Sequence, residues 1–176
     1  EEDARRYGKP LPVFATHPRT AERLADVRAA GEAAVAAGAS GERGREAYFE
    51  AVRPFLATWL ERELGRRMYD TSVQVIGDLR DGAPDDLQGL YTFWLGEAHR
   101  RRNEDGDRAR AAALFSAALD LPGAPPAAWR EHGLALRDQG DRDGARAALT
   151  RYLGLAPEAD DAAFVRQYLD QLEARP

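Results

Sequence analysis

Residues 106–157 read GDRARAAALFSAALDLPGAPPAAWREHGLALRDQGDRDGARAALTRYLGLAP, and they contain two copies of one pattern. The triplet Gly106-Asp107-Arg108 recurs as Gly140-Asp141-Arg142, 34 residues later. Four apolar positions recur with the same separation: Ala111, Phe115, Leu119 and Leu121 correspond to Ala145, Leu149, Leu153 and Leu155. A repeat of this length predicts pairs of helices, each of which buries its apolar face by stacking on the next pair.

The second copy has small, aromatic and proline residues at characteristic places. With Pro126 as position 1, the places are Trp129 at 4, Gly133 at 8, Ala145 at 20, Leu149 at 24 and Pro157 at 32. Small side chains at Gly133 and Ala145 permit the two helices of a pair to cross with their backbones close. This pattern resembles the tetratricopeptide repeat (TPR), most fully over residues 126–159 and also over 87–122. The resemblance implies an all-α fold, a TPR-like α-solenoid of antiparallel helix pairs with an N-terminal extension.

Composition bounds the classes of function. The chain has 176 residues, 44% of them hydrophobic, which is enough for a real core. Its net charge of -5, with acid and base interleaved, argues against nucleic-acid binding. Without cysteine it forms no disulfide or thiolate metal site, and no run approaches the roughly 20 apolar residues of a membrane span.

The remaining segments suggest how the chain is organised. Glu1 to Gly8 look like the last turns of a helix cut midway, so we expect the chain to be part of a longer protein. Pro18 favours a helix start, with the helix running to about Ala37. We expect the following parts: an N-terminal segment at 1–37, a Gly-rich hinge at 38–45, repeats at about 46–85, 87–122 and 126–159, and a capping helix at 160–173.

The first repeat is degenerate. From Glu46 the apolar spacing is helical, interrupted at Pro54, and a second helix begins near Tyr69 with Ser72 at the crossing and Ile76 and Leu79 inward. Asp107 and Asp141 each follow a glycine, which predicts a helix stop and then an N-cap acceptor. Asp160 or Asp161 is expected to cap the last helix, whose apolar face includes Phe164. Aromatic residues at helical spacing are expected in the core, not in a stacking platform.

The segment FATHPRTAERLADVRA, residues 14–29, carries a second resemblance. A His-Pro pair with Arg six residues after the His resembles the motif that ends the catalytic domain of HtpX/BepA-type zinc metallopeptidases, relatives of the CAAX prenyl proteases. The resemblance implies that His17 stabilises the oxyanion or covers the metal, and that Arg23 holds a Glu ligand. The alternative is that His17 is a turn or capping residue and Arg23 a solvated position.

The catalytic site itself is not encoded in this chain. The three His, at 17, 99 and 132, do not begin an HExxH, and a zinc hydrolase needs two or three fixed ligands and a base. We therefore expect no metal site and no catalysis by this chain alone, with zinc in the full-length parent enzyme. His99 and His132 are expected to be core residues.

Tetratricopeptide arrays bind peptide segments on the face lined by the first helix of each repeat. The register predicts these peptide-binding residues: Leu90, Phe93, Glu97, Arg100, Ala127, Arg130, Leu134 and Arg137. Arg100, Arg130 and Arg137 are candidates to hold a carboxylate. In the alternative interpretation they pair with Asp or Glu one turn away.

By these resemblances we expect the protein-docking region of a periplasmic or cell-envelope bacterial metalloendopeptidase involved in protein quality control. The repeats would bind a protein or peptide partner, or the parent's own catalytic domain. The alternative is a stand-alone TPR adaptor or scaffold that binds a peptide segment.

Overall fold

The computed structural model describes residues 20–38 and 44–173. The chain falls into two compact units, Glu1–Glu50 and Ala51–Pro176. The expected helix end at 1–8, His17 and the centre of the predicted hinge lie outside the described residues. The fold is all-α, and the described residues contain no sheet.

The first unit contains helix α2, Thr20–Ala36, close to the predicted bounds. Its side chains from residue 22 onward are exposed, including the apolar Leu24, Val27 and Val35. Arg23 is exposed in the first turns of this helix. Helix α3, Arg45–Val52, begins after Gly44, which adopts a positive φ of 58°.

Pro54 interrupts the next helical segment, as the sequence predicts. Helix α3 ends at Val52, and a 3-10 turn, η2 (Arg53–Phe55), contains the proline and leads into α4, Leu56–Gly65. Proline removes a backbone donor and fixes φ, so the continuous pattern is divided there. Leu56, Leu60 and Leu64 form the buried face of α4.

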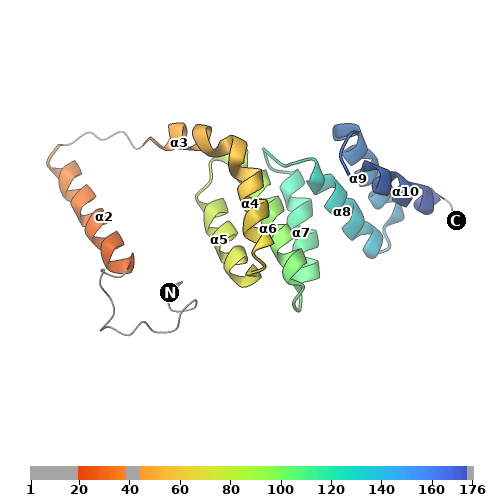
Figure 1. The fold of residues 1–176 in the computed structure, drawn as a ribbon, viewed down its shortest axis with the longest axis horizontal. Helices are drawn as coiled ribbons and strands as arrows, with labels where there is room; N and C mark the ends of the chain where they lie inside the picture. Colours follow the sequence, from red (N-terminus) through yellow and green to blue (C-terminus); the bar gives the residue numbers. More distant parts are fainter. Residues whose placement is uncertain (1–19, 39–43, 174–176) are drawn as a thin grey trace. The chain divides into compact units, whose positions relative to one another are not determined.

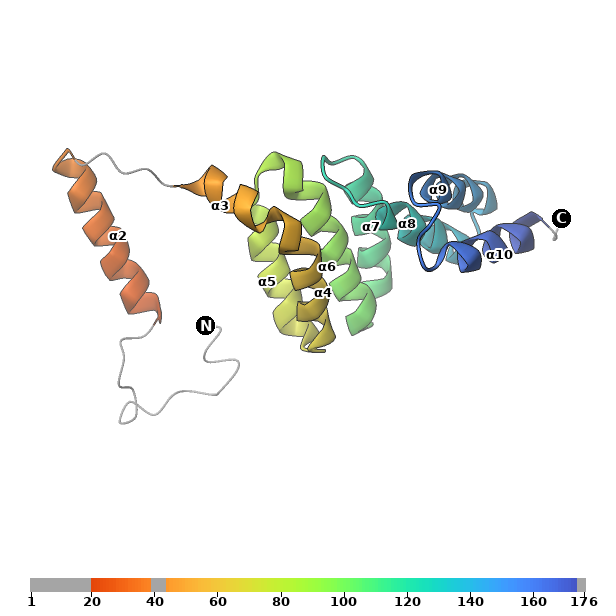
Figure 2. The ribbon, with the colours of Figure 1, turned by 45° about the horizontal axis from the view of Figure 1, so that its top comes forward.

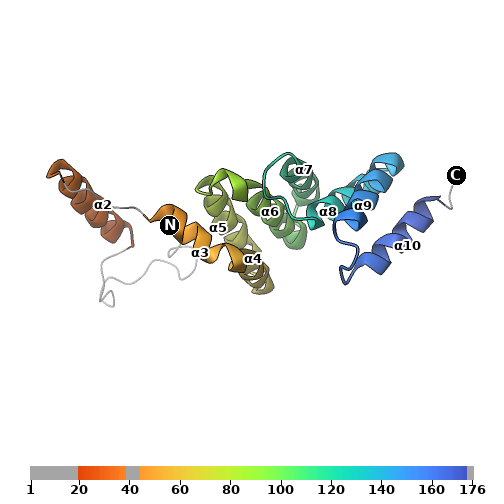
Figure 3. The same ribbon diagram turned by 90° about the horizontal axis from the view of Figure 1, so that it is seen from above.

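The helices of the second unit follow one another in sequential pairs (Figure 1). After α4 come α5 (Tyr69–Asp81), the 3-10 turn η3 (Asp85–Leu87), α6 (Gln88–Arg102), α7 (Asp107–Leu119), α8 (Ala127–Asp138), α9 (Arg142–Leu155) and α10 (Ala162–Glu173). The closest packing is between α6 and α7 and between α8 and α9. Helix α4 lies against both α5 and α6 (Figure 2), and α10 lies against α9 (Figure 3).

The two best-packed pairs cross at glycines. A Cβ added to Gly96 of α6 would lie 2.7 Å from the Phe115 ring of α7. A Cβ added to Gly133 of α8 would lie 2.9 Å from Cγ of Leu149 on α9. Because Phe115 and Leu149 are repeat-related positions, the two pairs are built alike, and the predicted need for small residues at the crossing is confirmed at Gly133.

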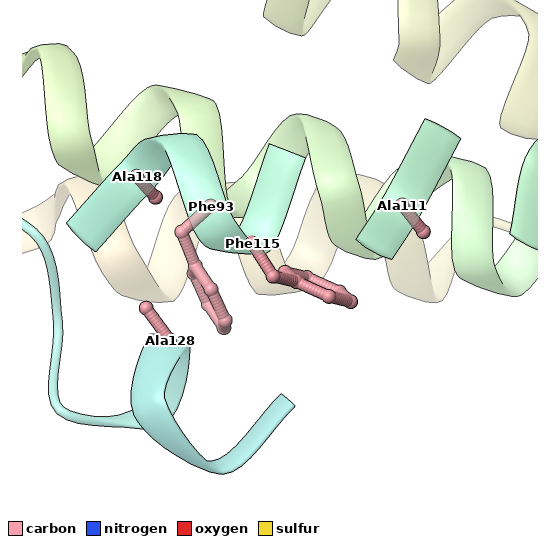
Figure 4. Packing of buried hydrophobic residues seen from close by; sticks show 5 residues of the cluster. All are labelled: Phe93, Ala111, Phe115, Ala118 and Ala128. Atoms are coloured by element: carbon pink, nitrogen blue, oxygen red, sulfur yellow. The ribbon is translucent and has the colours of Figure 1, made fainter. Parts of the chain in front are cut away.

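The core continues from one pair to the next. Phe93, Ala111, Phe115, Ala118 and Ala128 form one buried cluster, in which α6 and α7 meet the start of α8 (Figure 4). A second cluster of Leu149, Tyr152 and Val165 joins α9 to α10, and Trp129 of α8 packs against it. The interior is therefore shared by neighbouring pairs.

Several predicted positions differ from the structure. Leu79 is 45% exposed, and Phe164 is 68% exposed because Val165, one residue later, takes the buried place on α10. Phe55 and Trp59 are also exposed, stacked with ring centroids 5.7 Å apart, so the expectation that every aromatic at helical spacing is core is wrong. In contrast, Ser72 and Ile76 are fully buried, as predicted.

Candidate functional site

A groove lies between α7 and α8, and residues at the end of α6 also line it. Its volume is about 850 Å³. The lining residues are Arg100, Asn103, Gly106, Arg108, Ala109, Ala111, Ala112, Phe115, Glu131, Leu134, Ala135, Arg137, Asp138 and Gln139. We call this the α7–α8 groove.

The groove combines an apolar floor with polar walls. Ala111 and Phe115, both buried, and the half-buried Ala112, Leu134 and Ala135 supply apolar surface. Charged and amide side chains from the last turn of α6, the first turn of α7 and the last turns of α8 surround that surface. Such a site can hold an apolar side chain and a polar group of the same ligand.

Acidic and basic side chains alternate across α6, α8 and the turn that precedes α10, next to the groove. Arg100 donates to Glu97 at 2.7 and 2.8 Å, and its Nε lies 3.5 Å from Glu131 of α8. Arg130 donates to Glu131 at 2.8 Å and to Asp161, which also accepts from the Tyr152 hydroxyl. We call Glu97, Arg100, Glu131, Arg130 and Asp161 the charge ladder, since it joins α6, α8 and the residue preceding α10.

Burial and pairing act in opposite directions on the pKa of two carboxylates of the charge ladder, Glu97 and Asp161. Burial by itself would raise the pKa of Glu97, but hydrogen bonds and positive charge from Arg100 and Arg101 hold that pKa below its ordinary value. Burial likewise opposes the lowering of the Asp161 pKa, which Tyr152 and Arg130 produce. These carboxylates are therefore ionised and matched at neutral pH.

A second polar cluster fixes the turn between α6 and α7. Asp107 is fully buried and accepts from Arg102 Nε and Nη2, both at 2.8 Å, and from the backbone N–H of Glu104 at 3.1 Å. His99 Nδ1 lies 2.8 Å from Oδ1 of Asp107, and Arg102 Nη2 lies 3.3 Å from the same His99 nitrogen. Hydrogen bonds from Arg102, opposed by burial and helped by His99, hold the pKa of Asp107 well below its ordinary range.

The predicted cap at Asp107 is therefore wrong, whereas the one at Asp141 is confirmed. Asp107 is the first residue of α7, and its carboxylate faces α6. Asp141 is the N-cap of α9 and accepts from the Gly144 N–H at 2.9 Å. His99 is a satisfied core histidine as expected, and His132 is half-buried.

The structure places the eight predicted peptide-binding residues in different settings. Arg100, Leu134 and Arg137 line the α7–α8 groove. Phe93 is buried and Ala127 packs against the same cluster, so both belong to the core. Leu90 is half-buried outside the groove lining, and Glu97 and Arg130 are members of the charge ladder.

The three candidate arginines are all paired with carboxylates of this chain. Besides the contacts of Arg100 and Arg130, Arg137 donates to Asp138 at 2.8 Å and lies over the Tyr168 ring, 4.7 Å from its centroid. The alternative interpretation, pairing with a carboxylate one turn away, is confirmed for Arg100 with Glu97. Arg130 and Arg137 instead pair with the adjacent residue, and Arg130 also pairs with Asp161. The prediction missed Arg108 and Ala112, because it considered only the first helix of each pair and these residues lie on α7. It also missed Asn103, which follows the last turn of α6.

The metallopeptidase motif is described only in part, since His17 lies outside the described residues and Arg23 is exposed on α2. Within residues 20–38 and 44–173 no group of three or more His, Cys, Asp or Glu is placed to hold a metal ion. None of the helices in the described part of the chain combines the length and apolar character needed to cross a bilayer.

Comparison with known proteins gives no further guide: no protein-family model matches the chain, and a search of curated proteins finds no relative.

Proposed function

We propose that residues 46–176 form a helical repeat region of tetratricopeptide type that binds a segment of a partner protein. The 34-residue recurrence supports this, together with the like construction of its two copies. Gly96 meets Phe115 as Gly133 meets Leu149, and Ala111 and Ala145 are both buried. Repeats of this kind expose long surfaces suited to peptide binding.

The observation that carries the proposal is the α7–α8 groove. Its volume of about 850 Å³ lies within the usual range for ligand sites, roughly 300–1,000 Å³. Both helices that form it are held by buried contacts, so the site is preformed. A preformed groove lowers the entropic cost of binding an extended chain.

We further propose that the parent is an HtpX/BepA-type zinc metalloendopeptidase of the bacterial cell envelope, acting in protein quality control. The motif His17-Pro18 with Arg23 supports this part. By the resemblance, the zinc ligands would come from another part of the parent. The repeats would recruit substrate proteins, or pack against the catalytic domain and restrict access to it.

Peptide binding is tested with an array of capped dodecapeptides of varied sequence, probed with residues 1–176. We expect a subset of peptides to be retained, and retention to be lost in Ala109→Trp, which places an indole at the groove wall from an exposed position. Ala147→Trp is the matched control, since Ala147 is exposed on α9 and outside the groove. If both variants retain the peptides equally, the binding site is not the α7–α8 groove. If the unmodified chain retains no peptide, the proposed peptide-binding function is wrong.

The protease part is tested on the product of the complete gene. We expect that product to bind one zinc ion and cleave casein, residues 1–176 to do neither, and His17→Ala to lower turnover with zinc retained. If the complete product lacks zinc and activity, the metallopeptidase assignment is wrong. The stand-alone adaptor is then the function that remains.

A further inference from the structure

Arg108 is the lining cation of the α7–α8 groove that has no carboxylate partner among the described residues. Arg100 is held by Glu97, and Arg137 by Asp138. Arg108 stands in the first turn of α7 with its side chain exposed. Its guanidinium therefore remains available for a planar, bidentate contact.

The acidic residues of the groove are already matched. Glu131 is neutralised by Arg130, 2.7 Å away, and by Arg100. Asp138 is neutralised by Arg137. The lining thus has one cation in excess, although the whole chain carries a net charge of -5.

The surroundings of Arg108 define what else a ligand needs. Asn103 and Gln139 line the same groove and supply amide donors. The floor of Ala112, Phe115 and Leu134 offers apolar surface to a neighbouring side chain. A ligand that matches both features carries a carboxylate close to a large apolar group.

We propose that the groove binds an acidic, extended segment of a partner protein, in which Asp or Glu pairs with Arg108 and a nearby large apolar side chain rests on the floor. This inference rests on the proposed peptide-binding function and names the chemistry of its partner. The overall negative charge would favour basic segments at long range. Within the groove, however, the unpaired guanidinium of Arg108 favours an acidic side chain of the ligand.

Three pools of fluorescent, capped octapeptides test the proposal by anisotropy with residues 1–176. Their centres are Leu-Xaa-Glu, Leu-Xaa-Gln and Leu-Xaa-Lys, with the other positions varied. We expect the Glu pool to bind about tenfold more tightly than the Gln pool, and salt to weaken this preference. Arg108→Gln is expected to reduce the Glu pool to the affinity of the Gln pool.

The matched control is Arg151→Gln, which removes an exposed arginine of α9 outside the groove and makes the same change in net charge. It is expected to leave the preference intact. Ala109→Glu, from an exposed groove position, is expected to reverse the preference by repulsion. Circular dichroism of each variant shows that its helices are retained.

The outcomes separate this inference from the function on which it rests. If the Glu and Gln pools bind equally, or if Arg108→Gln keeps the preference, the carboxylate contact is wrong while peptide binding stands. Preference for the Lys pool overturns the inference in the same way. If none of the three pools binds, the inference is wrong. The dodecapeptide array then shows whether the proposed peptide-binding function is wrong as well.

Discussion

At the scale of single residues, Asp107 is a fully buried carboxylate that side chains of the neighbouring helix α6 contact. Its carboxylate is not exposed to solvent and contacts Arg102, His99 and the backbone N–H of Glu104. Arg102 also donates to Asp70 of α5 at 2.9 Å, so the cluster ties three successive helices together. Removing one member of a buried ion pair leaves its partner uncompensated.

We therefore expect Asp107→Asn to lower the free energy of unfolding by about 3 kcal/mol. Urea denaturation measures the change. Asp105→Asn is the control, because Asp105 is exposed in the same turn. A difference of less than about 1 kcal/mol between the two variants, the range of surface pairs, would show that the Asp107 cluster contributes little to stability.

Acid should act through the same residue. Because the pKa of Asp107 is lowered in the folded state, its contribution to stability is complete above the ordinary value of 3.8 and is lost as the pH falls below it. The lowered pKa values of Glu97 and Asp161 act in the same direction. Urea denaturation from about pH 5 down to pH 2 should show a smaller loss in Asp107→Asn than in the unmodified chain; parallel curves would contradict the assignment.

The same residue shows why sequence alone predicts the fold better than its details. Gly106-Asp107 and Gly140-Asp141 are identical in sequence, yet only Asp141 is a cap. Helix α8 ends at Asp138 and its C-cap, Gln139, directly precedes Gly140. Helix α6 ends at Arg102 with its C-cap, Asn103, in the left-handed region, and the longer turn that follows brings Asp107 against α6. Periodicity predicts that a helix exists, but the loop geometry that decides a side chain's partners depends on tertiary packing.

At the scale of helices, glycine has opposite effects on stability at two positions of the α8–α9 pair. A Cβ at Gly133 would meet Leu149 at 2.9 Å, whereas a Cβ at Gly154 of α9 would have nothing within 4 Å. Overpacking costs about 1–3 kcal/mol, while alanine gains about 1 kcal/mol of helix propensity. The balance therefore changes sign between the two sites.

We expect Gly133→Ala to destabilise the chain by about 1 kcal/mol and Gly154→Ala to stabilise it by about 0.5 kcal/mol. Urea denaturation of both variants checks the signs. In the Gly133→Ala background, Leu149→Ala should cost less than it does alone, because removal of Cγ relieves the contact. Equal effects of both glycine substitutions would mean that the helices of this pair can separate freely.

At the scale of the whole molecule, the amino-acid sequence predicted the order of the helices but only part of the candidate site. The 34-residue pattern is set by burial within each pair, and burial leaves a periodic trace in the sequence. The charge of the groove depends on which side chains form ion pairs between helices, as Arg100 of α6 does with Glu131 of α8. Those pairings join residues far apart in the chain and leave no local pattern, and Arg108 lies on the second helix of its pair, which the repeat register did not assign to the binding face.

Helix α2 gives the last prediction, because its apolar side chains at Leu24, Val27 and Val35 are 48%, 69% and 69% exposed. A helix of this length without tertiary burial is marginal in water. In residues 1–176 we expect the amides of α2 to exchange hydrogen at close to the rate of an unfolded chain, while those of α6 and α9 are protected. Hydrogen exchange with mass spectrometry resolves these segments.

The same measurement on the product of the complete gene separates the two roles proposed for this region. If the region packs against a catalytic domain, the apolar side chains of α2 gain partners, and its exchange slows by about a hundredfold, a local stabilisation of roughly 3 kcal/mol. If α2 exchanges equally fast in both proteins, packing through this helix is excluded and recruitment of substrate through the groove remains. Protection of α2 already present in residues 1–176 would contradict the exposure of its side chains and remove the basis for both expectations.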